Sequence, residues 1–467
     1  MIRLVSLFFA LVVCSNALSV GTYNVENLFD DIEQGREYRE YIPQNKHGWD
    51  RAMAQKKLSN TAYAINEMDV EILGIQEIEN EALLAKLAHE TNFPYYAFAI
   101  SRGAPSGVGL LSKYPIRYSK PITSPQSRVR ASLHVKLDIH GDELEIIVVH
   151  WPSLKNPNHF REAAARAIEP VMQKMKEGIV MGDFNDPFSS KSIASKMWAP
   201  LETYEGWFDP WMGVYPRWSH DFFGDKKALD RMLLSEGLFD GKGLDFVCGS
   251  FGPLMKKPFM KDGSPYRWQI TDRGKGKHTG EGYSDHLPLV LELSKEPFEC
   301  KAKKANIKEL FSLKTKSANI QINKAIVLYN HNEGMVIGDK SGSIYVYKPG
   351  FSLPVGTMVD LHVSALDKFF GMCEIRALHV TKKYAKKGDY KALMLDASRL
   401  KDARGGDVLS YVEGVVKKGK LHTKYGTIDL HVKPGFPKPK ENHMLTLERV
   451  RVGEYRGRVE LILEERE

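Results

Sequence analysis

The chain has 467 residues, which exceeds the size of one ordinary domain and indicates about two or three domains. Its composition, 43% hydrophobic and 27% charged, is typical of globular proteins and excludes a wholly disordered chain. The net charge of +8 is unevenly distributed, since residues 301–467 carry 31 Lys and Arg against 19 Asp and Glu. The C-terminal part is therefore expected to bind a polyanion, whereas the acidic N-terminal part is not.

Residues 1–19 have the pattern of a signal peptide. Arg3 supplies the positive charge, residues 4–13 form the apolar run, and residues 15–17 or 17–19 offer a small-residue cleavage site. The apolar run is shorter than the roughly 20 residues that a membrane span needs. No later segment is apolar enough, so no transmembrane segment is predicted. The mature protein is expected to be secreted or periplasmic.

Residues 20–296 alternate between strand-like and helix-like segments. Amphipathic periodicity predicts helices over Arg51–Met68 and Arg161–Lys176. Apolar or alternating runs predict six strands: Ile72–Gln76, Ser132–Ile139, Leu144–His150, Ile179–Asp183, Leu229–Ser235 and Leu287–Leu293. This alternation predicts a layered α/β domain.

Residues 297–317 are rich in lysine and are interpreted as a basic linker. Beyond them short strands dominate, and IYVYKPGF, ending at Phe351, returns as LHVKPGF, ending at Phe436. FFGMCEI (369–375) and YRGRVEL (455–461) follow with nearly the same spacing. The repeat predicts two related all-β modules, residues 318–400 and 401–467, that resemble five-stranded OB-folds.

Aromatic residues of these modules are candidates for stacking on nucleic-acid bases, and barrel core is the alternative for each of them. The candidates are Tyr345, Tyr347, Phe369, Phe370, Tyr411, Tyr425 and Tyr455.

Three cysteines, Cys248, Cys300 and Cys373, remain after removal of the signal peptide. An odd number leaves at least one of them unpaired within the chain. A Cys248–Cys300 bridge is one of the pairings that the sequence leaves open. The absence of a CxxC pair argues against a structural zinc site.

Polar residues with ligand chemistry lie at the ends of apolar segments in five places. VGTYNVENLFD contains Asn24, ILGIQEIEN contains Glu77, and IIVVHWPS contains His150. GDFNDP contains Asp183 and Asn185, and GYSDHLPLVLEL contains Asp285 and His286. Each has an ordinary alternative, namely a turn residue, a helix start, a hydrogen-bonded histidine or a loop cap. The occurrence of all five motifs in this order is hard to attribute to chance.

These motifs resemble the endonuclease/exonuclease/phosphatase superfamily, and NVENLFD, QEIEN, HWPS, GDFND and SDHLP are similar to its secreted bacterial nuclease branch. The resemblance covers roughly residues 20–295. It implies a four-layer αββα sandwich, deoxyribonuclease I-like, with catalytic loops at one edge. The expected fold class is therefore α/β, followed by all-β OB-like barrels.

The resemblance also implies roles for individual residues. Asn24, Glu77 and Asp285 are the expected metal ligands, and their oxygen atoms suit Mg²⁺ or Mn²⁺. Ca²⁺ is a further candidate, although no ligand pattern points to it. Asp183 would orient or deprotonate the attacking water, with Asn185 beside it.

The phosphate-contacting groups follow from the same resemblance. His150 and His286 would hydrogen-bond the scissile phosphate, and Asp230, in ALDRMLLS, would orient His286. Arg130 stands where the superfamily has a substrate-binding arginine. Lys275 and Lys277 precede the catalytic pair in a basic loop, which would contact a polyanion or would be an ordinary solvated charge run.

The leading hypothesis is a secreted metal-dependent nuclease of low sequence specificity, with an endonuclease that cleaves DNA (a DNase) as the expected type. The protein is expected to be a monomer. DNA is the expected substrate, and RNA is a second candidate. An alternative is a phosphoesterase that acts on a phospholipid or an inositol phosphate. A third hypothesis, an inactive hydrolase domain used as a scaffold, predicts losses among the catalytic positions, and none is lost.

Overall fold

The computed structural model describes residues 17–189, 191–198, 206–313 and 316–465. The predicted signal peptide lies outside the described residues up to position 16, and its last two residues begin the first strand. Within the described residues, no helix is long and apolar enough to cross a membrane.

The N-terminal domain contains two mixed sheets. The first has the order β13-β17-β1-β2-β4-β3, with β14 also paired to β17. Its strands are β1 (Leu18–Leu28), β2 (Ile72–Ile78), β3 (Tyr95–Ala99), β4 (Gly107–Ser112), β13 (Asp245–Phe246), β14 (Gly252–Pro253) and β17 (Leu289–Ser294).

The second sheet has the order β5-β6-β7-β8-β12-β9. Its strands are β5 (Ile116–Ile122), β6 (Ser132–Ile139), β7 (Asp142–His150), β8 (Gly178–Asp183), β9 (Trp207–Phe208) and β12 (Asp230–Ser235). Side chains from both sheets, among them Val20 and Ile72 from the first and Val148 and Met181 from the second, form one buried cluster between them.

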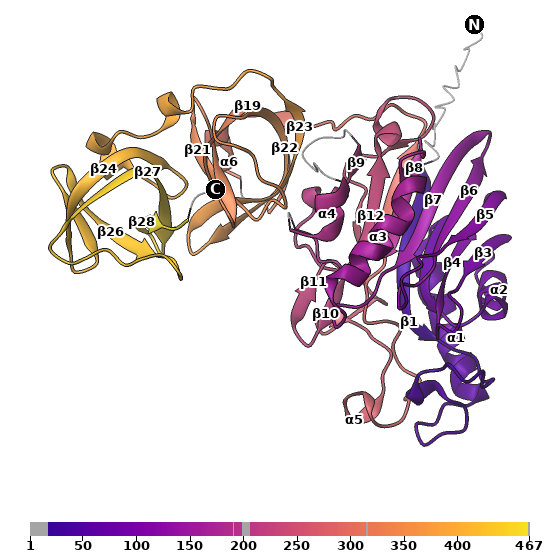
Figure 1. Ribbon diagram of the computed structural model, residues 1–467. Helices are drawn as coiled ribbons and strands as arrows, with labels where there is room; N and C mark the ends of the chain where they lie inside the picture. Colours follow the sequence, from indigo (N-terminus) through magenta and orange to yellow (C-terminus); the bar gives the residue numbers. More distant parts are fainter. Residues whose placement is uncertain (1–16, 190, 199–205, 314–315, 466–467) are drawn as a thin grey trace, which may run out of the picture.

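Helices cover the outer faces of the two sheets. α1 (Arg51–Met68) and α2 (Glu81–Glu90) pack on the first sheet, and α3 (Asn158–Met172) and α4 (Ile193–Trp198) pack on the second. This gives the layer order α, β, β, α that Figure 1 shows in its right half. The predicted four-layer sandwich is confirmed.

Short elements complete the connections. They are η1 (Arg39–Tyr41), η2 (Pro210–Gly213), β10 (His220–Phe222), β11 (Asp225–Lys227), η3 (Glu236–Phe239), β15 (Met260–Lys261), β16 (Ser264–Pro265) and α5 (Thr271–Gly274) in the first domain, and η4 (Lys391–Leu393) and η5 (Ala397–Asp402) beyond it.

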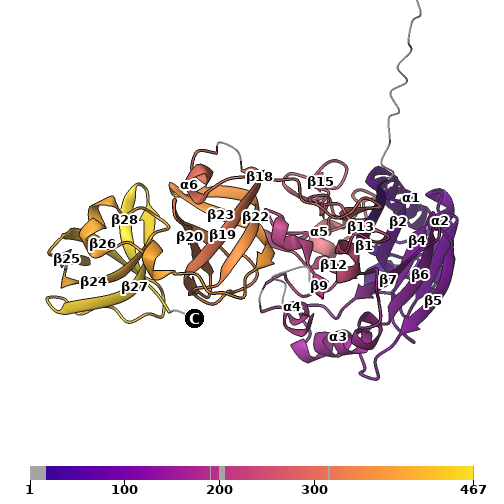
Figure 2. The same cartoon turned by 90° about the horizontal axis from the view of Figure 1, so that it is seen from above.

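Two five-stranded barrels follow in a row, and the second lies farther from the sandwich (Figures 1 and 2). The first consists of β19 (Ser317–His331), β20 (Gly334–Asp339), β21 (Gly342–Tyr347), β22 (Met358–Phe369) and β23 (Met372–Lys383). The second consists of β24 (Val408–Lys417), β25 (Lys420–Thr423), β26 (Gly426–Val432), β27 (Met444–Tyr455) and β28 (Arg458–Leu463).

Both barrels have the same topology. The strands run 1-2-3-5-4 and the fourth pairs back with the first, while the third and fifth strands are parallel. This arrangement agrees with the predicted OB-like barrels. The sequence repeat falls on equivalent places, the end of the third strand and the turn between the fourth and fifth.

The predicted basic linker, residues 297–317, contains packed structure. β18 (Lys303–Lys304) pairs with β19, and α6 (Ile307–Leu310) begins with a capping box at Asn306 and Glu309. Ile307 and Leu310 are buried in the core that the first barrel shares with the sandwich. The linker therefore attaches to the first barrel along much of its length.

The first barrel also contacts the sandwich directly. Arg217 Nη1 donates a hydrogen bond to the carbonyl of Lys348 over 2.7 Å, and Ser364 Oγ donates to the carbonyl of Gly213 over 2.7 Å. Since the buried core runs on from one domain into the other, these contacts lie at the rim of an apolar interface.

Several predicted elements agree closely with the structure. The helix over Arg51–Met68 has the predicted bounds, because Asp50 caps its start and the left-handed Asp69 ends it. The second predicted helix is displaced, since α3 starts after Pro157 and ends at Met172. Proline is favoured at a helix start, and the chain folds back toward β8 soon after Met172.

Candidate active site

The polar strand ends predicted from the sequence meet at one edge of the sandwich. β7 and β8 are parallel and bring His150 opposite Asp183. The antiparallel β12 places Asp230 on the other side of Asp183. β1 and β2 are also parallel and bring Asn24 beside the end of β2. Because parallel strands end at the same edge, distant segments converge there.

Asn24 lies at the centre of this cluster. Its Nδ2 donates hydrogen bonds to Glu77 Oε1 and to Asp183 Oδ2, each over 3.2 Å. Its Oδ1 accepts the backbone N–H of Glu26 over 3.1 Å. Asn24 therefore fixes two carboxylates from different sheets relative to each other.

Glu77 is held by the backbone. The N–H of Asn27 donates to Glu77 Oε2 over 3.0 Å. Glu77 itself has φ +69°, a left-handed conformation that costs energy in a residue with a side chain. Glu77 lies near the end of β2, where the strand pairing is irregular, and such strained positions are often found at functional sites.

Asp183 is buried at the end of β8. Its Oδ1 accepts the N–H of Asn185 over 2.8 Å, and its Oδ2 accepts Asn185 Nδ2 over 2.9 Å. Burial raises the pKa of Asp183 to about 7, with Asp230 and Glu77 acting in the same direction against the charge of His286. Asp183 is therefore poised to exchange a proton near neutral pH.

Gly182 permits the backbone course before Asp183. It has φ +137°, and a Cβ at this position would lie 2.0 Å from the carbonyl oxygen of Val149. Only glycine fits this close approach between β7 and β8.

His286 forms a pair with Asp230. Its Nδ1 lies 2.7 Å from Asp230 Oδ2, which also accepts a hydrogen bond from Ser219 Oγ over 2.6 Å. Burial disfavours the imidazolium, but the charge and hydrogen bond of Asp230, together with Asp183, outweigh it and raise the pKa of His286 well above its usual value. His286 thus carries positive charge and directs Nε2 toward Asp183, 3.9 Å away.

His150 has the opposite electrostatic character. Its Nε2 lies 3.6 Å from both Glu77 Oε1 and Asp183 Oδ2. Burial, with the nearby charges of Arg130 and His286, lowers the pKa of His150 well below its usual value. The site therefore combines one charged and one neutral imidazole.

Asp285 lies beside two residues that the sequence analysis missed. Its Oδ2 is 3.6 Å from Arg267 Nη2 and 3.7 Å from His220 Nε2. Burial opposes ionisation, but His220, His286 and Arg267 together lower the pKa of Asp285 below its usual value. The ring of His220 lies tilted against that of His286, with centroids 4.6 Å apart.

Glu26 and Lys57 also belong to the neighbourhood and were missed. Glu26 accepts Arg267 Nη2 over 2.5 Å, and burial, with the charge of Asp285, raises the pKa of Glu26 to about 7. Lys57 Nζ donates to the carbonyls of Val25 and Tyr283, and burial lowers the pKa of Lys57 to about 8. Glu26 lies within the NVENLFD motif, which could have revealed it, whereas Lys57 has no local signal.

The predicted substrate-binding residues divide into two groups. Arg130 lies at the site, where its Nη1 donates to the carbonyl of Trp151 over 3.2 Å. Lys275 and Lys277 are exposed on a loop. Across the described part of the chain, neither lysine side chain makes a hydrogen bond or ion pair with a site residue, so the structure does not bring these two into the cluster.

The donor set fits a divalent cation that prefers oxygen ligands. Glu77 and Asp183 both accept hydrogen bonds from Asn24, and Glu26 is a further buried carboxylate of the same motif as Asn24. Burial raises the pKa of Asp183 and of Glu26, with repulsion from Asp230 and Glu77 acting on Asp183 and repulsion from Asp285 acting on Glu26. A divalent cation would stabilise their ionised forms. His220, Asp285 and His286 also offer ligand atoms that lie within 4.8 Å of one another.

The sequence profile of the Endonuclease/Exonuclease/phosphatase family matches residues 19–295. The chain belongs to this family, whose fold supports divalent-metal-dependent phosphodiester hydrolysis. A comparison with curated proteins gave no match.

Solved structures with similarity to this chain include a humanized TDP2 from D. rerio, at 17% identity and a TM-score of 0.40, covering 60% of this chain and 99% of that one. An endonuclease/exonuclease/phosphatase family protein from Bacteroides thetaiotaomicron has 14% identity and a TM-score of 0.40, covering 59% and 97%. A functionally unknown conserved protein from Enterococcus faecalis has 17% identity and a TM-score of 0.41, covering 59% and 99%.

Proposed function

We propose that this chain is an exported endonuclease that hydrolyses phosphodiester bonds of DNA with low sequence specificity and requires Mg²⁺ or Mn²⁺. The observation that carries the proposal is the convergence of Asn24, Glu77 and Asp183 with the His286–Asp230 pair. Hydrolysis of a phosphodiester needs a positioned water and positive charge where negative charge develops. This cluster offers both.

Asp183 is proposed to receive the proton of the attacking water. The two hydrogen bonds from Asn185 hold its carboxylate in place. The imidazolium of His286 would donate from Nε2 to a phosphate oxygen, because Asp230 occupies Nδ1. Neutral His150 would serve as a hydrogen-bonding partner without adding charge.

Glu77 and Asn24 are proposed to hold the divalent cation, with Asp285 on the neighbouring segment. The cation would polarise a phosphoryl oxygen and stabilise the leaving alkoxide. Asp285 sits next to Arg267 and His220, so its carboxylate also has cationic partners within the protein.

The C-terminal barrels are proposed to hold the polymer. Two adjoining pockets share Tyr347 and Arg376, and we call them together the aromatic–arginine groove. Tyr215 of the sandwich lines the first pocket, and Phe369 and Phe370 line the second, which lies between the two barrels. The guanidinium of Arg376 lies 4.5 Å from the ring centroid of Tyr347, and Phe369 and Phe370 remain about half exposed. Exposed rings beside arginines suit the stacking of single-stranded bases.

Export is proposed from the pattern of residues 1–19. β1 begins at Leu18, so cleavage after Ala17 would leave this strand complete, and cleavage after Ser19 would remove its first two residues. The proposal expects the mature chain to start at Leu18. Mass spectrometry of the exported protein measures this directly.

The test of the function uses plasmid DNA with added Mg²⁺, with EDTA, and with an Asp183→Asn variant. We expect metal-dependent nicking and a loss of about 10²-fold or more in the variant, as general-base catalysis contributes about 10²–10⁴-fold. Asp186→Asn is the matched control, because Asp186 lies in the same motif but caps α4 through the N–H groups of Ile193 and Ala194.

Two outcomes would contradict the proposal. An Asp183→Asn variant that nicks as fast as the parent would remove Asp183 from its role. A chain that leaves DNA and RNA intact but hydrolyses a phospholipid or an inositol phosphate would keep the family and change the substrate.

A further inference from the structure

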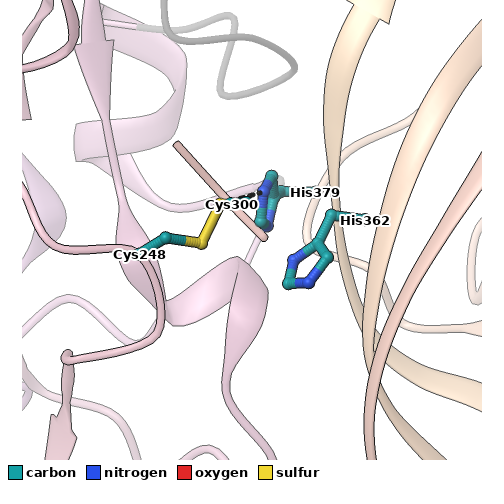
Figure 3. Close-up of side chains that lie close together, drawn as sticks. All are labelled: Cys248, Cys300, His362 and His379. Atoms are coloured by element: carbon teal, nitrogen blue, oxygen red, sulfur yellow. Dashed lines mark hydrogen bonds between the residues drawn. A yellow bond between two sulfur atoms is a disulfide. The ribbon is translucent and has the colours of Figure 1, made fainter. Parts of the chain in front are cut away.

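A cluster of sulfur and imidazole ligands lies where the sandwich meets the first barrel, and it shares no residue with the catalytic motifs. We call it the interdomain Cys/His cluster, and it consists of Cys248, Cys300, His362 and His379. One ligand atom from each residue lies within 4.8 Å of the others. Figure 3 shows the two imidazoles turned toward the Cys248–Cys300 disulfide.

The two domains contribute equally to this cluster. Cys248 follows β13, and Cys300 lies in the segment that leaves the sandwich after β17. His362 on β22 and His379 on β23 are direct partners in the antiparallel ladder of the first barrel. Their side chains therefore project from the same face of the barrel toward the two cysteines.

The hydrogen-bond pattern of His362 indicates a ligand position. Its Nε2 lies 2.7 Å from Asn319 Oδ1, and this amide oxygen can only accept, so Nε2 carries the proton. Nδ1 then presents a lone pair. This atom is buried without a hydrogen-bond partner among the described residues, and His362 is only 5% exposed. A metal-bound histidine is usually oriented in this way by an outer-shell oxygen.

His379 is arranged in a compatible way. Its Nε2 lies 3.9 Å from Cys300 Sγ, and its ring centroid lies 4.8 Å from that of His362. His379 is buried next to His362, a place that favours an uncharged ring. Two thiolates and two neutral imidazoles around Zn²⁺ would leave no net charge in this buried place.

We propose that the interdomain Cys/His cluster is a tetrahedral zinc site when its cysteines are reduced, and that the Cys248–Cys300 disulfide is the metal-free, oxidised state of the same site. Zinc bonds of about 2.3 Å to sulfur and about 2.0–2.1 Å to nitrogen place neighbouring ligands roughly 3.3–3.8 Å apart. The four ligand atoms lie within 4.8 Å of one another, so modest side-chain rotations that separate the two sulfurs would reach this spacing. The Cα atoms of the cysteines are 5.3 Å apart, so rotation about each Cα–Cβ bond can separate the sulfurs.

The conversion of the disulfide state into the zinc-bound state is balanced in atoms and electrons. Reduction by a phosphine consumes one water and gives two thiols and the phosphine oxide, and Zn²⁺ then displaces the two thiol protons. Because two ligands belong to each domain, bound zinc would fasten the sandwich to the first barrel. The disulfide alone lies within the sandwich and its exit segment.

The test uses the purified full chain, with Co²⁺ as a spectroscopic probe in place of Zn²⁺. After reduction by a phosphine we expect a thiolate-to-cobalt charge-transfer band whose intensity corresponds to one thiolate-bound Co²⁺ per chain, and we expect added Zn²⁺ to abolish this band. The oxidised chain should show no such band. The catalytic group of His220, Asp285 and His286 has no sulfur and cannot produce it.

Variants separate the site from other thiols and histidines. His362→Gln and Cys300→Ser should weaken zinc binding by more than about 100-fold, since loss of an outer-shell partner alone costs about 10–100-fold. Asn319→Ala removes only the outer-shell partner of His362, so it should weaken zinc binding by the smaller factor of about 10- to 100-fold. Cys373→Ser, which removes the free cysteine outside the cluster, should bind like the parent.

Three results would overturn the zinc-site proposal. A reduced, folded chain without the charge-transfer band would overturn the zinc site. So would a band that survives both His362→Gln and His379→Gln with circular dichroism unchanged. If Cys248 and Cys300 release no thiols unless the chain unfolds, the fold does not accommodate the reduced state, and the proposal fails.

Discussion

At the scale of single residues, the candidate site is defined by the electrostatic contrast between its two histidines. Asp230 lies 2.7 Å from His286 and outweighs its burial, whereas His150 is 3.6 Å from Glu77 and Asp183 and is dominated by its own burial. Two imidazoles in one site therefore carry different charges at the same pH.

Asp230 should act through His286. In Asp230→Asn the neutral amide no longer stabilises the imidazolium, so His286 loses much of its positive charge at neutral pH. We expect kcat for DNA nicking to fall by about 10²-fold with a smaller change in KM. Steady-state kinetics on a fluorescent oligonucleotide provide the measurement.

Ser219→Ala serves as the comparison for Asp230→Asn. Ser219 donates a neutral hydrogen bond to the same carboxylate oxygen, and its loss leaves the negative charge beside His286. A much smaller loss of rate is expected. Equal rates for Asp230→Asn and the parent would show that the pair has no role in the reaction.

At the scale of elements, the strands determine which polar groups become buried. β19 and β21 place His331 next to Tyr345, with Nε2 2.9 Å from the phenolic oxygen and Nδ1 3.4 Å from Glu464. Burial lowers the pKa of His331 to about 4, despite the charge of Glu464. The barrel thus holds a neutral histidine that the unfolded chain would protonate below pH 6.5.

His331 should make the first barrel sensitive to acid. The folded pKa lies below the unfolded value, so the unfolded state binds more protons between about pH 6.5 and 4, and stability falls as the pH falls through this window. At pH 5 the loss is on the order of 2 kcal/mol. His331→Gln should flatten the dependence of the thermal midpoint between pH 7 and 5.

The control for His331 is an exposed histidine of the second barrel. His431 is accessible, so its replacement by glutamine should leave the pH dependence nearly as in the parent. A His331→Gln variant that loses stability with acid as steeply as the parent would assign the effect to other groups.

At the scale of the whole molecule, the two barrels together form an exposed aromatic cluster where they meet. The ring of Phe370 lies 4.6 Å from those of Phe369 and Tyr455, which come from different barrels. Arg456 lies over Phe370 at 5.8 Å. A single-stranded polymer could therefore contact both barrels at once.

Phe370 should contribute to polymer binding through stacking. Phe370→Ala is expected to weaken binding of a single-stranded oligonucleotide by about 5- to 100-fold, because base–aromatic stacking is worth about 1–3 kcal/mol. Fluorescence anisotropy at two salt concentrations measures the affinity and its electrostatic part.

Tyr95→Ala is the control for Phe370→Ala. Tyr95 is similarly exposed but lies on β3, at the edge of the first sheet of the sandwich. The Tyr95→Ala variant should bind the single-stranded oligonucleotide with the same affinity as the parent. If Phe370→Ala also binds like the parent, the groove does not hold the polymer by stacking.

Burial narrows the set of stacking residues that the sequence predicts for the two barrels. Tyr345 is 3% exposed and belongs to the barrel core, as the alternative interpretation held, whereas Phe369, Phe370, Tyr411 and Tyr455 are exposed. Strands favour aromatic residues on either face, so only the barrel's closure decides which face meets solvent.

The sequence by itself determined the family, the two sheets' principal strands and the set of strand-end polar residues. These depend on short motifs and on periodicity, which are local properties of the chain. Asn24, Glu77, Asp183 and His286 were found in this way, because each lies next to an apolar run in the sequence.

Only the tertiary structure decided which distant groups meet. Arg267 reaches Asp285 from a loop and His220 reaches it from β10. Cys248 and Cys300 meet two histidines of the first barrel although no CxxC pair exists. Strand pairing and domain docking create these neighbourhoods. They bring together residues that no spacing along the chain connects, and this is why local patterns could not reveal them.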